Sequence, residues 1–98
     1  MKYILYVGSP DNFGRYFASL KVQEFKINVS DHKFISKDFT VFRRGIQDPE
    51  MLRGYNVDEV VINSFEYNAL SIEKQKELER VIRPLVAFSS GKVLYLDP

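Results

Sequence analysis

Three short segments of the chain are apolar at every position, whereas a strand with one wet face alternates apolar and polar side chains. A strand that is covered on both faces of a sheet requires such continuous runs. They are Tyr3-Ile4-Leu5-Tyr6-Val7, Val60-Val61-Ile62 and Val93-Leu94-Tyr95-Leu96. Helical periodicity separates them, and strands that alternate with helices form parallel sheets through crossover connections. The pattern predicts one α/β domain over residues 1–98, with a mostly parallel sheet between two helical layers.

The first helical stripe follows the opening strand. Its apolar positions recur at the i, i+3, i+4 and i+7 spacing of an amphipathic helix, and Asp11 or Asn12 stands where a cap is needed. The pattern predicts a helix over about residues 12–22. The apolar positions are Phe13, Tyr16, Phe17 and Leu20.

A second stripe of the same spacing precedes the last apolar run. Asn68 or Ser71 is expected to cap this long helix, and its charged segment 73–77 should face water. Pro84 should kink or stop the helix, because proline lacks a backbone donor and clashes with the preceding turn. The apolar positions are Leu78, Val81, Ile82 and Leu85.

The middle of the chain has a different pattern. Phe25, Ile27 and Val29 alternate with polar residues, which predicts a half-buried strand at an edge of the sheet. Residues 34–42 indicate one or two further strands, which we expect at the periphery. The segment from Asp48 to Gly54 predicts a short helix with a proline at its first position.

Composition restricts the function classes. The 98 residues are 45% hydrophobic and 28% charged, and 14 basic against 13 acidic side chains leave a net charge of +1. This balance excludes a DNA mimic and a general basic coat for nucleic acid, but it allows a local basic patch. The absence of cysteine excludes disulfides, thiolate metal sites and cysteine nucleophiles. The apolar runs are too short for a membrane span or a signal peptide. We therefore expect a cytoplasmic protein without membrane contact.

The turn between the first strand and the first helix is the main candidate for phosphate binding. In an α/β sheet such turns lie at the carboxyl end of a strand and often cradle phosphates. The turn resembles the loop of P-loop nucleotide hydrolases, which reads Gly, four residues, Gly, Lys and then Ser or Thr. With Ser9 in the first position, Gly14 matches the second glycine, whereas Arg15 and Tyr16 stand where the family has Lys and then Ser or Thr. The candidate phosphate-binding residues are Gly8, Ser9, Asn12, Gly14 and Arg15.

A second stretch, from Leu52 to Phe65, resembles the segment that leads through the metal-binding strand of helicase-like and viral DNA-packaging ATPases. The resemblance implies that Asn63 takes the place of the magnesium-site aspartate and Ser64 that of the water-activating glutamate. Asn63 supplies no anionic ligand, and Ser64 is no base near neutral pH. Residues 89–96 are similar to the next strand of that fold.

The resemblance therefore implies a P-loop-like fold in a shortened, degenerate relative of these ATPases. The lysine, the metal ligand and the base are all changed. Catalysis of phosphoryl transfer depends almost entirely on positioning and charge stabilisation. We accordingly expect a protein that is not an enzyme, with no catalytic residue, no metal site and no cofactor.

Basic and aromatic residues alternate in the middle segment. A single-strand nucleic-acid platform uses charges for phosphates and ring faces for bases. The same rings also fit an ordinary inward-facing strand, with Arg43 on the same side at its end, and core packing is the favoured interpretation. The single histidine, His32, lies in a polar turn and is expected to be exposed. Candidates for contact with a partner or nucleic acid are Lys33, Lys37, Phe39, Arg43 and Arg44.

Three functions follow as hypotheses. The first is a small non-enzymatic accessory protein, virus-encoded and so in the host cytoplasm, that binds a protein partner through residues 33–46 and exposed aromatic residues of the first helix. An alternative is a nucleotide- or phosphate-binding module that uses the turn from Gly8 to Arg15. Another is a nucleic-acid binder that uses Arg43 and Arg44. An open sheet edge would also permit a homodimer.

Overall fold

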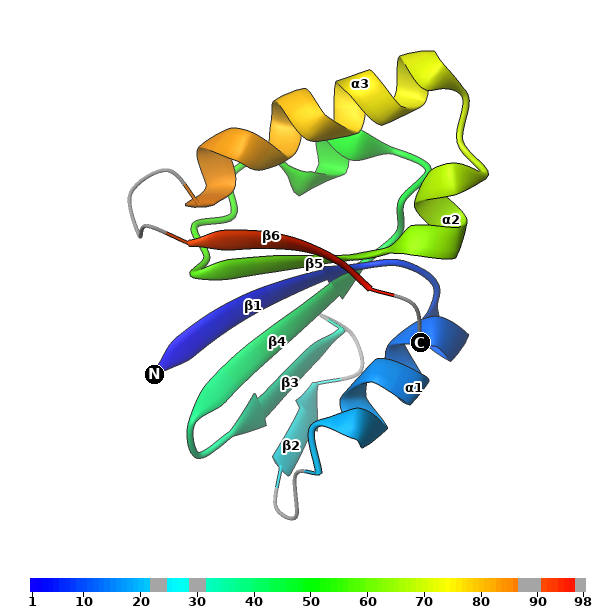
Figure 1. Cartoon of the computed structure of the whole chain (residues 1–98). Helices are drawn as coiled ribbons and strands as arrows, with labels where there is room; N and C mark the ends of the chain where they lie inside the picture. Colours follow the sequence, from blue (N-terminus) through cyan, green and yellow to red (C-terminus); the bar gives the residue numbers. More distant parts are fainter. Residues whose placement is uncertain (22–24, 29–31, 87–90, 97–98) are drawn as a thin grey trace.

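The computed structural model describes residues 1–21, 25–28, 32–86 and 91–96. Over these residues the chain forms a six-stranded sheet between two layers of helices (Figure 1). The strands are β1 (Lys2–Val7), β2 (Phe25–Asn28), β3 (Lys33–Ser36), β4 (Phe39–Arg44), β5 (Glu59–Asn63) and β6 (Lys92–Leu96). The helices are α1 (Pro10–Ser19), α2 (Ser64–Asn68), α3 (Ile72–Ile82) and two short 3-10 helices, η1 (Pro49–Leu52) and η2 (Arg83–Val86).

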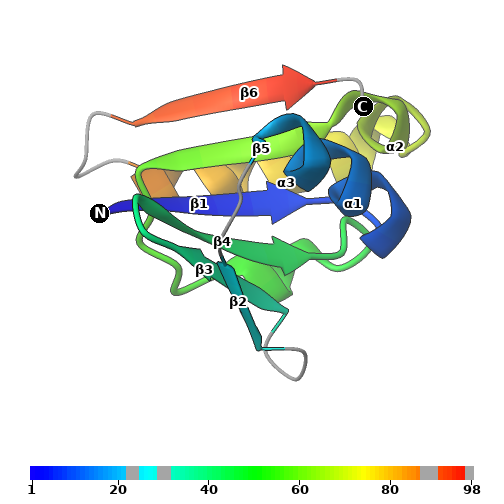
Figure 2. The same cartoon turned by 90° about the horizontal axis from the view of Figure 1, so that it is seen from below.

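The strand order is β2-β3-β4-β1-β5-β6. β1 runs parallel to β4 on one side and to β5 on the other, and β5 runs parallel to β6. β2 and β3 extend the sheet beyond β4 as antiparallel strands (Figure 2). The predicted α/β fold with a mostly parallel sheet is confirmed, and the alternating strand does lie at an edge.

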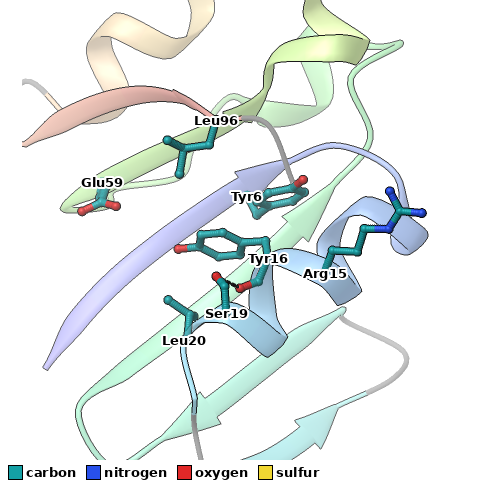
Figure 3. Close-up of a pocket in the computed structure, with 7 residues that line it drawn as sticks. All are labelled: Tyr6, Arg15, Tyr16, Ser19, Leu20, Glu59 and Leu96. Atoms are coloured by element: carbon teal, nitrogen blue, oxygen red, sulfur yellow. Dashed lines mark hydrogen bonds between the residues drawn. The ribbon is translucent and has the colours of Figure 1, made fainter.

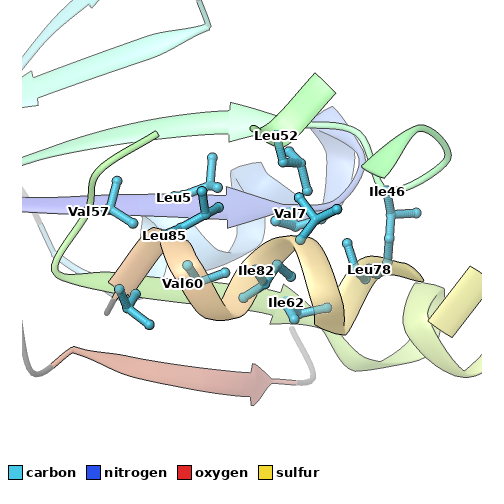
Figure 4. Close-up of a cluster of buried hydrophobic side chains, with 12 residues drawn as sticks. Leu5, Val7, Ile46, Leu52, Val57, Val60, Ile62, Leu78, Ile82 and Leu85 are labelled. Carbon is cyan, nitrogen blue, oxygen red and sulfur yellow. The ribbon is translucent and has the colours of Figure 1, made fainter. Parts of the chain in front are cut away.

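Each face of the sheet carries its own hydrophobic core, because alternate residues of a strand point to opposite faces. The smaller core lies under α1 and contains Ile4, Tyr6, Phe13, Tyr16, Val41 and Val61. The larger core lies under α3, η1 and η2 and is drawn in Figure 4. Its buried residues are Leu5, Val7, Ile46, Leu52, Val57, Val60, Ile62, Leu78, Val81, Ile82, Leu85 and Val86. The continuous apolar runs of β1 and β5 serve these two cores, as their pattern predicts.

β4 corrects the expectation that residues 34–42 form only peripheral strands. It pairs with the central β1 along its whole length. Val41 is fully buried on one face, and Phe42 packs against the larger core on the other. The polar Thr40 is also buried, at 2% exposure. Because this central strand contains a buried polar residue, its sequence lacks the continuous apolar run that predicts a central position. Only β2 and β3 are peripheral.

β6 is a second correction, since its continuous apolar run predicts a strand covered on both faces. It lies at the end of the strand order, and Tyr95 and Leu96 are 43% and 40% exposed. Val93 packs against the larger core, but on the α1 side no helix of the described residues covers β6 (Figure 2). The apolar run therefore includes exposed hydrophobic surface.

α1 begins earlier than the predicted helix. Ser9 is its N-cap, because the Ser9 Oγ accepts a hydrogen bond of 3.2 Å from the backbone N–H of Asn12. Asp11 and Asn12, the predicted caps, lie within the first turn. The helix ends at Ser19, and its predicted end at residue 22 lies outside the described residues.

The predicted long helix is α3, and Ser71 rather than Asn68 is its cap. Asn68 ends α2, whereas Ser71 caps α3 by accepting a hydrogen bond of 3.2 Å from the N–H of Lys74. The helix stop is confirmed, because α3 ends at Ile82 and Pro84 lies in η2. The apolar stripe is buried as predicted: Leu78, Val81, Ile82 and Leu85.

The remaining expectations are met in part. The short helix predicted from Asp48 to Gly54 is the 3-10 helix η1, and Gly54 follows it with a φ of 93°. Val29, the last residue of the predicted edge strand, lies outside the described residues. Within the described ranges, no helix has the length and apolarity that a bilayer crossing requires.

Candidate functional site

The connection that follows β1 and the connection from β4 to β5 lie on opposite faces of the sheet. α1 follows β1 on one face, whereas η1 lies on the other face, before β5 (Figure 1). In open α/β sheets, ligands bind beyond the carboxyl ends of the strands at such a point. The carboxyl ends of β1, β4 and β5 converge there. We refer to the polar residues at these ends as the switch-point cluster: Gly8, Ser9, Asn12, Arg43, Asn63 and Glu66.

A carboxylate of the protein itself fills the predicted phosphate-binding turn. The Ser9 backbone N–H lies 3.0 and 2.9 Å from the two carboxylate oxygens of Glu66, and the Asn12 side-chain amide donates to Glu66 Oε2 at 2.9 Å. The donors at the N-terminus of a helix, together with its dipole, favour a negative charge. In this protein the charge is Glu66, from α2. A phosphate in this turn would have to displace that side chain.

Gly8 permits this close approach. A Cβ atom at Gly8 would lie 2.7 Å from Glu66 Oε2 and 2.8 Å from the ring of Tyr6. Gly14 differs, because it lies in α1 and a Cβ atom there would meet no heavy atom within 4 Å. The structure thus brings together three of the five candidate phosphate-binding residues and separates two: Gly8, Ser9 and Asn12 lie at the cluster, and Gly14 and Arg15 lie outside it.

Asn63 holds Glu66 in place. It is fully buried, its Oδ1 accepts a hydrogen bond of 2.9 Å from the N–H of Glu66, and its Nδ2 donates to the Tyr6 hydroxyl at 3.3 Å. Ser64 is the first residue of α2. The two residues that the resemblance aligned with a metal ligand and a base therefore begin a helix. Sequence reasoning missed Glu66, although Asn63 and Glu66 have the three-residue spacing of a helix-capping pair.

Arg43 and Arg44 do not form one basic patch, because neighbours on a strand point to opposite faces. Arg43 points to the α1 side, where its Nη1 donates to the carbonyl of Gly8 at 3.0 Å. Its Nε is buried without a hydrogen-bond partner among the described residues. Burial and the nearby Arg44 lower the pKa of Arg43, and Glu66 acts in the opposite direction.

Arg44 and Lys33 share the other face of the sheet. The Arg44 guanidinium lies 5.2 Å from the centre of the Tyr55 ring, and Lys33 Nζ lies 5.5 Å from the centre of the Phe42 ring. The two ring centres are 5.3 Å apart. We refer to these four residues as the basic-aromatic face: Lys33, Phe42, Arg44 and Tyr55.

The other candidate contact residues lie apart from this face. Phe39 packs against the smaller core, and Lys37 is exposed in the turn between β3 and β4. His32 is exposed, as expected. Of the aromatic residues on the first helix, Phe13 and Tyr16 are buried against the sheet and Phe17 is half-buried against the smaller core.

A pocket of about 310 Å³ lies between α1, β5 and β6 (Figure 3). It is on the α1 side of the sheet, next to the part of that face that α1 leaves uncovered. The ring of Tyr6 stacks on that of Tyr16 with 4.9 Å between their centres. The lining residues are Tyr6, Arg15, Tyr16, Ser19, Leu20, Glu59 and Leu96.

The charged groups of the pocket lie at its ends. Glu59 forms a salt bridge of 2.7 Å with Lys2. Burial, followed by the charge of Glu59, raises the pKa of Tyr16 to about 12, so the phenol is uncharged at neutral pH. Arg15 is exposed and makes no hydrogen bond or salt bridge within the described residues. The pocket therefore has an apolar interior with a cation at one end.

The switch-point cluster and the pocket are the two candidate ligand sites on the α1 side of the sheet. Within the part of the chain that the structure describes, no three His, Cys, Asp or Glu side chains gather in a way that could hold a metal ion. The Glu66 carboxylate in the switch-point cluster is already hydrogen-bonded to Ser9 and Asn12, whereas the pocket is open. Of these two candidate sites, the pocket is the one that offers a ligand unoccupied volume.

Comparisons with known proteins support the fold. No family model matches the sequence, and no curated protein matches it. The structure is similar to that of the large terminase from a thermophilic bacteriophage, with a TM-score of 0.60 and 8% sequence identity. The match covers 96% of this chain and 25% of the terminase, so the chain spans about a quarter of that protein's length. At this identity the likeness shows a shared α/β fold.

Proposed function

We propose that the protein is a small binding protein, not an enzyme, that acts through a protein partner. The observation that carries the proposal is the Glu66 carboxylate in the turn that would otherwise cradle phosphate. Binding a nucleotide there would require breaking the hydrogen bonds to Ser9 and Asn12 and placing phosphate beside a carboxylate. Both steps are unfavourable.

We also propose an evolutionary origin for the chain. The chain would be a shortened, degenerate relative of P-loop ATPases, encoded by a virus and working in the host cytoplasm. The fold likeness to a phage large terminase supports this statement. The altered positions Arg15, Tyr16, Asn63 and Ser64 support the loss of hydrolysis, since none supplies the family's metal ligand or base.

Exposed apolar side chains support a protein partner. Tyr95 and Leu96 lie on the edge strand β6, Phe65 is 65% exposed on α2, and Ile72 is 70% exposed on α3. Edge strands present unpaired backbone donors and acceptors, which can pair with another chain. A homodimer through an open sheet edge stays a prediction, which sedimentation velocity at several concentrations would test.

Nucleotide binding is tested by thermal unfolding in millimolar MgATP and MgGTP. A ligand that binds the folded state at 100 times its dissociation constant would add about 2.7 kcal/mol to the stability. We expect no shift of the melting temperature. Any shift would contradict the proposal, and a shift that disappears in Asn12→Ala would place the nucleotide at the turn.

The protein partner is tested by photo-crosslinking in extracts of the cells in which the protein is made. A photoreactive residue at the exposed Ala18, which is next to the pocket residue Ser19 but does not line the pocket, is compared with one at Lys76 on α3. We expect a discrete crosslinked species from at least one position that an excess of unlabelled protein competes away. If neither position gives such a species, the result would count against a partner at these surfaces.

A second candidate function is nucleic-acid binding, which the basic-aromatic face favours. Lys33 and Arg44 supply two cations beside two rings, and the strand register places the exposed Lys26 on the same side as Lys33. Such a face suits single strands, whose phosphates meet the cations. The role predicted for Arg43 does not fit this surface, because Arg43 points to the opposite face.

The test of this candidate is oligonucleotide binding at low and increasing salt. A nucleic-acid site loses affinity steeply as salt rises. Under the second candidate, Lys33→Gln and Arg44→Gln each weaken binding, whereas Lys76→Gln on α3 does not. Retention that is equal in all variants, or no retention at low salt, would exclude the basic-aromatic face as a nucleic-acid site.

A further inference from the structure

The pocket between α1, β5 and β6 is suited to one large side chain. Its volume is about 310 Å³, and a protein cavity of about 150 Å³ is enough to hold benzene. A single aromatic side chain therefore fits with room for part of its backbone. Its walls are the rings of Tyr6 and Tyr16 and the side chains of Leu20 and Leu96. Aromatic pairs gain energy beyond the area that they bury, so these walls favour an aromatic guest.

The charges around the pocket favour an anionic neighbour of that guest. Arg15 lies at one end and forms no salt bridge within the described ranges. At the other end Glu59 is neutralised by Lys2, and the exposed Lys92 lies beside Glu59 in the strand register. Among the described residues, three cations against one carboxylate leave the rim positive. A carboxylate next to the aromatic group would meet Arg15, which offers a planar, bidentate donor.

The position of the pocket explains how a peptide would reach it. Leu96 lines the pocket and lies on β6, the edge strand of the sheet. A segment that follows this edge can insert one side chain into the pocket while its backbone stays outside. Such anchors, buried in a preformed pocket, contribute most of the binding energy in many interfaces.

We propose that this pocket receives an aromatic side chain of an acidic segment of the protein partner, with a neighbouring carboxylate bound by Arg15. This inference rests on the proposed function, because it names the partner chemistry of that function. The occupant is a peptide segment that carries phenylalanine, tyrosine or tryptophan beside aspartate or glutamate.

The test uses three blocked dipeptides as probes: acetyl-Glu-Phe-amide, acetyl-Gln-Phe-amide and acetyl-Glu-Ala-amide. Binding is followed by NMR chemical shifts of the protein, including the methyl groups of Leu20, Val61 and Leu96. We expect saturable shifts at these methyls with both phenylalanine probes and none with the alanine probe. Loss of the carboxylate should weaken binding about twofold to fivefold, the range of an exposed ion pair.

Protein variants separate the ring from the charge. In Arg15→Gln the Glu-Phe and Gln-Phe probes should bind equally, because the cation that distinguishes them is gone. Ser19→Leu fills the pocket from the exposed end of α1 and should abolish binding of both probes. Lys76→Gln removes one positive charge from the opposite side of the sheet and should change neither affinity. Backbone NMR spectra establish that each variant is folded.

Several results would overturn the inference. They are no shift with any probe, shifts that map to another surface, equal binding of the alanine probe, or an unchanged preference for Glu-Phe in Arg15→Gln. The photo-crosslinking experiment distinguishes this failure from that of the proposed function. A partner that crosslinks at Lys76 and not at Ala18 would leave the proposed function standing and remove the pocket as its site.

Discussion

Removal of the Glu66 side chain should destabilise the protein more than its half-buried position suggests. The carboxylate accepts hydrogen bonds from the Ser9 N–H and the Asn12 amide. A hydrogen bond to a charged group contributes about 1.5–3 kcal/mol. Because Glu66 is partly exposed, we take the lower part of this range for each donor, and Glu66→Ala should cost about 2–4 kcal/mol. Glu66→Gln keeps an acceptor oxygen and should cost about 1–2 kcal/mol, since it loses the charge beside the helix N-terminus.

The assay is equilibrium unfolding in urea, with thermal unfolding as a second measurement. For a domain of this size 1 kcal/mol corresponds to roughly 4–8 °C in melting temperature, so Glu66→Ala should lower it by roughly 10 °C or more. Glu73→Gln is the matched control, because Glu73 is exposed in the first turn of α3. It should change stability by less than about 0.5 kcal/mol.

A double-mutant cycle identifies the contact responsible. Asn12→Ala removes one of the two donors, and its cost should shrink once Glu66 is already alanine, because interacting residues are not additive. The reasoning is refuted if Glu66→Ala behaves like Glu73→Gln, or if the effects of Glu66→Ala and Asn12→Ala simply add.

Three further predictions concern other parts of the fold. Gly8→Ala should lower the free energy of unfolding by about 1–3 kcal/mol, because the new Cβ would lie 2.7 Å from Glu66 Oε2. Gly14→Ala in α1 should raise it by about 0.5–1 kcal/mol. Urea unfolding of both variants checks this contrast, and changes of the same sign would contradict it. Leu78→Ala should cost about 2–5 kcal/mol, because a fully buried side chain leaves a cavity, while Ile72→Ala, at a position that is 70% exposed, should change stability by less than about 0.5 kcal/mol. Tyr16 has a folded-state pKa of about 12, raised from 10.0, so its stabilising contribution is complete below pH 10 and is lost as the pH rises to 12. The loss amounts to roughly 2 kcal/mol, and in Tyr16→Phe the fall of stability over this pH interval should be smaller; an identical fall would show that Tyr16 does not titrate as described.

Periodicity predicted the elements whose burial is regular. The stripe of α3 and the runs of β1 and β5 each face a core, so their patterns follow directly from the side of the element that is buried. The stop at Pro84 follows from the chemistry of one residue. These features depend on short stretches of sequence, and a local pattern is sufficient to find them.

The two errors in the strands have a common cause. Thr40 lies in a central strand, and Leu96 lies in an edge strand, yet the first is polar and the second apolar. Strand position depends on which strands pair, and pairing is set by contacts between residues far apart in the chain. A hydrophobic pattern indicates whether a residue tends to be buried, but it does not indicate which strand pairs with its own strand.

The turn between β1 and α1 shows that a local sequence pattern also cannot identify contacts between distant residues at the candidate site. The residues from Gly8 to Arg15 predict a helix N-terminus that attracts an anion, and the structure contains both the helix and the anion. The anion, Glu66, is 57 residues away from Ser9, so no spacing within the turn could identify it. The three-residue spacing of Asn63 and Glu66 is typical of a helix N-terminus and could have placed Glu66 in a helix. Only the parallel pairing of β1 with β5 brings that helix to the turn. Parallel strand pairing places the N-terminus of α1 at the carboxyl edge of the sheet, where phosphates often bind. The same pairing places Glu66 at this edge, and Glu66 occupies the turn.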